Sequence, residues 1–188
     1  MKKNGRKLDA VAVSSGPGSY TGLRIGVSVA KGLCFGFGIP LISIPTLELL
    51  ASTAINREGG AKEVLYCSML DARRMEVYAA IYRPDLSTVR KASADIVTAE
   101  TYAEWLQESP ICFFGNGSSK CKPVIDSPNA RFLDDVHPLA ANMVPLANQR
   151  FEKAEFEDVA YFEPFYLKEF QATIAKNKVL NEALHHKE

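Results

Sequence analysis

A glycine-rich turn that joins an apolar run to a long helical pattern constrains the fold of this chain most. Residues 8–13 are mostly apolar, as expected for a strand covered on both faces. The Gly-Pro-Gly sequence at residues 16–18 ends that strand, because glycine admits backbone angles that side chains exclude. Ser19 or Thr21 can then cap a helix over residues 21–37 by accepting a bond from a free backbone N–H. This order of strand, tight turn and helix predicts an α/β protein.

The rest of the chain continues the alternation of strands and helices. Strands are predicted at residues 41–44, 63–70, 75–82, 92–97, 111–114 and 131–133. Helices are predicted at residues 46–55, from residue 98 to beyond Trp105, near Lys120 and at residues 137–151. Thr46 is the predicted cap of the first of these helices. The polar, glycine-containing residues 56–60 predict a lobe boundary. We therefore expect a first lobe at residues 1–58, a second at 59–160, and a C-terminal segment at 161–188 that returns to the first lobe, with a helix or frayed tail at 174–184.

Composition excludes several classes of protein. Lys plus Arg equals Asp plus Glu at 22 each, which argues against a protein that grips nucleic acid over its whole surface. No apolar run reaches the length of a membrane span, and four scattered cysteines predict neither a disulfide framework nor a zinc site. We expect a cytoplasmic protein without membrane contact.

Candidate catalytic groups are few. The chain has only three histidines, His137, His185 and His186, and their spread is poor for a metal site. Ser14, Ser15 and Ser19 surround the first glycine turn, but they form no nucleophile elbow and serve better as turn and cap residues. We therefore predict no catalytic residue and no metal ligand.

Several sequence stretches resemble the TsaB (YeaZ) family of tRNA threonylcarbamoyladenosine biosynthesis proteins. They are SSGPGSYTGLRIGVSVAKGL from Ser14, IPTLELL from Ile44, LDARRMEVY from Leu70, FGNG from Phe114 and PFYLK from Pro164. The stretches follow the family's order over nearly the whole chain. The family normally begins with a strand meander and a helix ahead of the glycine turn, so the chain resembles a member with a truncated first lobe.

The resemblance implies a two-lobe α/β fold of the actin-like, sugar-kinase-like type (ASKHA, ribonuclease H-like). It implies a non-catalytic scaffold that binds the catalytic subunit TsaD and the ATPase TsaE, and that meets tRNA indirectly through the complex. The metal-binding histidine pair of TsaD corresponds here to Thr46 and Leu50, which cannot replace it. Two alternatives stay open: an ATP-binding, phosphotransferase-type enzyme, and a homodimer without an enzyme partner.

The resemblance also implies a partner contact through the helix at residues 21–37. That helix is apolar nearly all round, and its small residues recur every fourth position, so either another part of the chain or a partner can approach it closely. The predicted interface residues are Gly22, Leu23, Gly26, Val27, Ala30, Lys31 and Cys34.

Two smaller groups complete the candidates. We expect no bound cofactor, and the residues that could contact a nucleotide are Gly16, Pro17, Gly18, Ser19, Gly115 and Gly117. Asp71, Arg73 and Arg74 lie in a predicted hairpin turn, where the arginines either contact tRNA or a partner, or form a solvated tip with a local ion pair.

Overall fold

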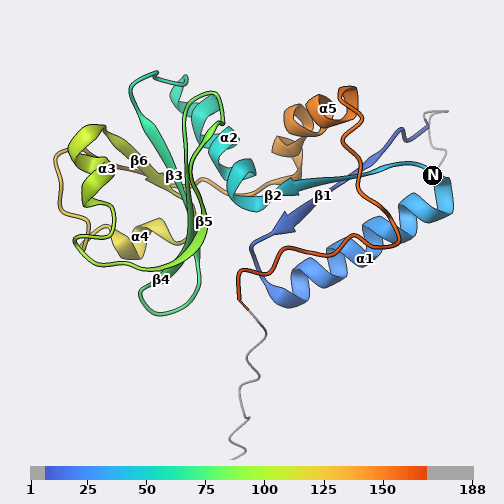
Figure 1. Ribbon diagram of the computed structural model, residues 1–188, viewed down its shortest axis with the longest axis horizontal. Helices are drawn as coiled ribbons and strands as arrows, with labels where there is room; N and C mark the ends of the chain where they lie inside the picture. The colour runs from blue at the N-terminus through green and yellow to red at the C-terminus, as the bar shows by residue number, and fades with distance from the viewer. Residues whose placement is uncertain (1–6, 169–188) are drawn as a thin grey trace, which may run out of the picture.

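The computed structural model describes residues 7–168 of the chain, and these form two β-sheets with a helix between them (Figure 1). The first sheet pairs β1 (Val11–Gly16) with β2 (Leu41–Pro45) in parallel. The second sheet has five strands in the order β5-β4-β3-β6-β7. Helix α2 (Thr46–Glu58) connects β2 to the second sheet.

Helices α1 and α5 cover opposite faces of the first sheet. Helix α1 (Tyr20–Phe37) packs Ala30 and Cys34 against Leu41 of β2 and its neighbours. On the other face Leu146 of α5 (Val144–Glu152) packs with side chains of β2 and α2. The sequence after α5 then runs back along the first sheet, where the Phe165 N–H donates to the Ser15 carbonyl at 2.7 Å.

The second sheet contains an antiparallel hairpin inserted beside parallel strands. Strands β3 (Leu65–Asp71) and β4 (Glu76–Tyr82) form the hairpin, and β5 (Thr88–Ile96) pairs antiparallel with β4. Strands β6 (Ile111–Phe114) and β7 (Ala130–Leu133) run parallel to β3. The remaining elements are α3 (Ala103–Glu108), α4 (Ser118–Cys121) and the 3-10 helix η1 (Ala140–Met143).

Alternating side chains of β3 face two different cores. Tyr66 and Leu70 pack against α2, whereas Cys67 and Met69 face the core that includes Tyr102 at the start of α3. A strand covered on both faces has few polar positions, and Ser68 is accommodated because its hydroxyl donates to the Leu47 carbonyl at 2.7 Å.

The structure corrects three predicted helix starts. The helix predicted from residue 98 begins only at Ala103, because hydrogen-bonded turns occupy the residues before it. Thr46 is the first residue of α2 and provides no cap, because its hydroxyl is hydrogen-bonded to Ser14 at 2.6 Å. The helix predicted over residues 137–151 is divided into η1 and α5, with Pro145 in the first turn of α5, where a missing N–H is tolerated.

The lobe boundaries predicted at residues 58 and 160 stay predictions, and the tail at 174–184 lies outside the described residues. Within residues 7–168 no helix is both long and apolar enough to cross a membrane.

Candidate functional site

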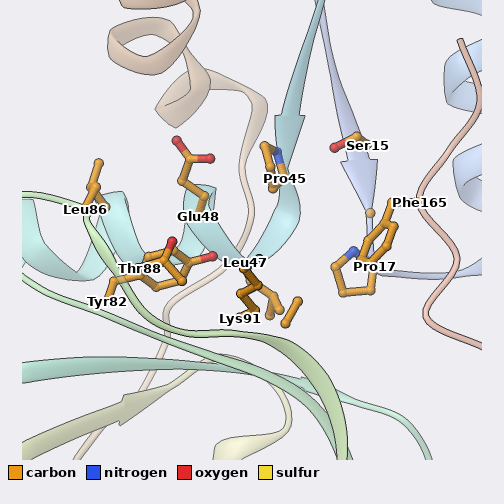
Figure 2. Close-up of a pocket in the computed structure, with 12 residues that line it drawn as sticks. Ser15, Pro17, Pro45, Leu47, Glu48, Tyr82, Leu86, Thr88, Lys91 and Phe165 are labelled. Atoms are coloured by element: carbon orange, nitrogen blue, oxygen red, sulfur yellow. The ribbon is translucent and has the colours of Figure 1, made fainter.

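A cavity of about 410 Å³ opens between the two sheets, where β1 ends and α2 begins. Pro17 and Phe165 line one side, and Tyr82, Leu86 and Thr88 line the opposite side (Figure 2). Most of the lining is therefore contributed by apolar and aromatic side chains.

Polar and charged side chains from α2, β4 and β5 also line the cavity. Glu48 is ion-paired with Arg150 of α5 at 2.8 Å, so its charge is balanced within the chain. Burial raises the pKa of the Tyr82 hydroxyl above its usual value. Lys91 of β5 is exposed and lines the cavity as well. Among the described residues, no group of three acidic, histidine or cysteine side chains could hold a metal ion.

The first glycine turn is closed by the chain itself. Gly16 has φ of 108°, and a Cβ there would meet the carbonyl oxygen of Phe165. Ser19 caps α1, since its hydroxyl accepts from the Gly22 N–H at 3.3 Å. Pro17 lies at the cavity, whereas Gly18 lies against Leu23. The turn therefore allows the backbone at Phe165 to lie directly against β1.

The second glycine turn lies apart from the cavity lining. Gly115 has φ of 95°, and a Cβ there would overlap the Met69 carbonyl oxygen. A Cβ on Gly117 would lie 2.8 Å from the Leu70 carbonyl carbon. Both glycines thus allow the residues before α4 to approach β3 closely, and unlike Gly16 neither of them lines the cavity.

Helix α1 corrects the predicted interface. Leu23, Val27, Ala30 and Cys34 are buried inside the chain, so they cannot form a surface for a partner. Lys31 donates to the Ala160 and Phe162 carbonyls at 3.1 and 3.0 Å, which fastens residues 160–162 to α1. Of the predicted set, Gly22 is exposed, and Gly26 and Lys31 are half-buried.

The opposite side of α1 carries the apolar surface that the prediction missed. Ile25, Val29 and Phe37 are 61%, 58% and 54% exposed, and Leu33 is exposed between them. These four residues recur every fourth position and thus share one face of the helix. We name Ile25, Val29, Leu33 and Phe37 the outer face of α1. Their spacing was visible in the sequence beside that of the small residues.

The hairpin turn between β3 and β4 places Asp71, Arg73 and Arg74 at the surface. Asp71 is ion-paired with Lys120 of α4, and hydrogen bonding from Lys120 lowers the pKa of its carboxyl group. The carboxylate also accepts from the Arg73 N–H at 3.0 Å. The Asp71 carboxylate is therefore bound by Lys120 and by a backbone N–H, and not by an arginine side chain.

Comparison with known proteins gives a consistent family assignment. The family model described as TsaD, tRNA N6-adenosine threonylcarbamoyltransferase, matches residues 2–176. The TsaB protein of Escherichia coli K12, named a tRNA threonylcarbamoyladenosine biosynthesis protein, is 32% identical over 86% of this chain and 71% of its own length. The Bacillus subtilis protein of the same name is 33% identical over 63% of this chain and 51% of its own length. The match thus spans about half of the second relative.

Solved structures agree with this assignment. A Pseudomonas aeruginosa protein, described as uncharacterized with similarity to peptidase YEAZ, aligns with a TM-score of 0.72 and 26% identity. That alignment covers 86% of this chain and 74% of the other. A second structure, YeaZ from Pseudomonas aeruginosa, gives a TM-score of 0.67 at 26% identity over 85% of this chain and 74% of its own.

Proposed function

Since the chain belongs to the TsaB (YeaZ) family, we propose that it serves tRNA threonylcarbamoyladenosine biosynthesis as a subunit that binds its partners. The family resemblance carried by the sequence motifs is confirmed by the relatives. The expected α/β fold of the actin-like type is confirmed by the likeness to the YeaZ structures.

The observation that carries this proposal is the outer face of α1. Contiguous apolar residues on an exposed helix face mark an interaction site more often than scattered ones do. Figure 1 shows α1 on the outside of the first sheet, with the sheet and the C-terminal segment on one side of it. The exposed glycines at positions 22, 32 and 36 leave the backbone accessible to a partner helix.

The area of the outer face of α1 limits the size of the contact that it can make alone. The outer face of α1 extends from Ile25 to Phe37, about 20 Å of helix, and a stripe about 10 Å wide along it covers roughly 200 Å². A standard interface buries about 800 Å² on each partner. The outer face of α1 is therefore the apolar centre of a larger contact, and we propose that this contact is made with TsaD.

The further roles follow as parts of the same proposal. The assembly of this chain with TsaD would recruit the ATPase TsaE, and the chemistry on tRNA would take place in TsaD. The alternative enzyme function would need a nucleotide in the cavity beside Pro17, and saturable ATP binding by the chain alone would favour it. Packing of both glycine turns against the chain's own backbone supports the binding role instead.

Light scattering on size-exclusion fractions tests the proposal. The chain is measured alone and mixed with TsaD, as the wild type and as the variants Val29→Asp and Ser28→Asp. Both variants place one carboxylate on α1, but Ser28 lies off the outer face. We expect a mixed complex with the wild type and with Ser28→Asp, and none with Val29→Asp. A self-dimer that Val29→Asp breaks, with no TsaD complex, would establish the homodimer alternative and overturn the proposal.

A further inference from the structure

The turn between β3 and β4 holds two adjacent arginines in an unusual backbone conformation. Arg73 has φ of 72° and Arg74 has φ of 49°. Both angles lie in the left-handed region, which glycine or asparagine adopts at much lower cost than arginine. A turn built only to reverse the chain would be less strained with those residues.

Neighbouring residues brace this strained turn. The Asn116 side-chain oxygen accepts from the Asp71 N–H at 3.0 Å, and Lys120 donates both to the Asp71 carboxylate and to the Glu76 carbonyl. Figure 1 shows the turn next to α4, which carries Lys120. The turn is thus held in one conformation by groups outside it.

The turn carries an excess of positive charge from Arg73 and Arg74. The two nearest acids are each ion-paired with a lysine, Asp71 with Lys120 and Glu76 with Lys168. Arg73 and Arg74 are exposed, and no ion pair joins either side chain to an acid among residues 7–168. Two guanidinium groups with free donors therefore project from a fixed turn.

We propose that Arg73 and Arg74 contact the phosphodiester backbone of tRNA, an inference that rests on the proposed function. Guanidinium groups bind phosphate oxygens through paired N–H donors, and such contacts position an RNA without reading its sequence. A protein interface needs an apolar centre. Ile96, opposite Glu76 on β5, is the only large hydrophobic residue exposed on the strands beside this turn within the described chain. An exposed, charged turn of this kind fits a phosphate backbone better.

Fluorescence anisotropy with a labelled tRNA transcript tests the proposal at several salt concentrations. The test variant is the double substitution Arg73→Ala and Arg74→Ala. The matched control is Lys62→Ala with Arg83→Ala, which removes the same charge from exposed positions at the other end of the β3–β4 hairpin. We expect the test variant to bind on the order of tenfold more weakly, and the slope of log affinity against log salt to fall by about 1.5.

A second variant separates binding from folding. Arg73→Asn with Arg74→Gly relieves the strained backbone, so its melting temperature should equal or exceed that of the wild type. The proposal predicts that this variant nevertheless loses tRNA affinity as the alanine variant does.

Other outcomes overturn the proposal. These are no salt-dependent tRNA binding by the wild type, equal weakening by the Lys62 and Arg83 control, or loss of TsaD binding with unchanged tRNA affinity. The last outcome would identify the turn as a protein contact. TsaD association of the same samples shows separately whether the proposed function holds, since it is measured without RNA.

Discussion

Replacing Asp95 should reveal how much the second sheet depends on one buried carboxylate. Asp95 accepts from both terminal nitrogens of Arg90, at 2.6 and 2.7 Å, and from the Tyr102 hydroxyl at 2.8 Å. Ser93 adds a fourth hydrogen bond at 2.8 Å. The Arg90 guanidinium also lies over the rings of Tyr102 and Trp105. Asp95 thus joins β5 to the start of α3 through a network in which Asp95 and Tyr102 are buried, whereas Arg90, Ser93 and Trp105 are half-buried.

The variant Asp95→Asn keeps the shape of the side chain and removes its charge. Breaking a buried ion pair by neutralising one partner costs about 3–5 kcal/mol. The Arg90 side chain is 23% exposed, so water partly solvates it after the change. We therefore expect the free energy of unfolding to fall by about 3 kcal/mol, at the lower end of that range. For a domain of this size the melting temperature should fall by about 6–12 °C.

Urea denaturation followed by circular dichroism measures this loss, with Asp71→Asn as the control. Asp71 is also ion-paired, but at the surface, where such pairs contribute less than about 1 kcal/mol. A loss for Asp95→Asn that is no larger than the control's would refute the reasoning.

The pH dependence gives an independent check on the same network. Burial alone would raise the pKa of Asp95, but hydrogen bonds from Arg90, Tyr102 and Ser93 outweigh it and hold the pKa below the usual value. A carboxyl group with a lowered folded-state pKa stabilises the protein above its unfolded pKa of about 3.9. The stability difference between wild type and Asp95→Asn should therefore be full at pH 7 and shrink as the pH falls below about 4 through the folded-state pKa.

Further predictions concern the glycines and the cysteines. Gly115→Ala should lower the free energy of unfolding by at least about 2 kcal/mol in urea denaturation, because the new methyl group meets the Met69 carbonyl at a strained φ. Gly32→Ala, on the open side of α1, should raise it by about 0.5–1 kcal/mol, and a loss there would contradict the helix assignment. All four thiols are buried, and burial raises the pKa of Cys112 to about 11 and that of Cys67 well above its usual value. A thiol reagent at pH 8 should therefore react with none of them in the native protein and with all four in guanidinium, and rapid native reaction would contradict the burial.

The second sheet was predictable because its strands carry strong local signals. The hairpin of β3 and β4 follows two apolar runs separated by a short charged turn, and the observed strands lie within about one or two residues of the predicted ones. Strand β5 begins at Thr88, before the predicted residue 92. Its early residues alternate less clearly because the β4–β5 register shifts on either side of Ile81.

The faces of α1 could not be assigned from sequence alone. The helix has two apolar sides, and burial is decided by which of them meets β1 and the C-terminal segment. The small residues Ala30 and Cys34 allow that close packing, so the chain uses for itself the side that the prediction gave to a partner. Similarly, the ion pair between Glu48 and Arg150 joins residues far apart in the sequence, and no local pattern indicates it.

The dissociation constant of the complex with TsaD tests the central claim most directly. Calorimetric titration of TsaD with the wild type, Val29→Asp and Ser28→Asp compares a carboxylate on the outer face of α1 with one beside it. The account predicts that Ser28→Asp binds as the wild type does and that Val29→Asp binds on the order of 100-fold more weakly, since an unpaired charge would be buried in an apolar contact. Equal affinities for all three proteins would show that TsaD does not bind this face.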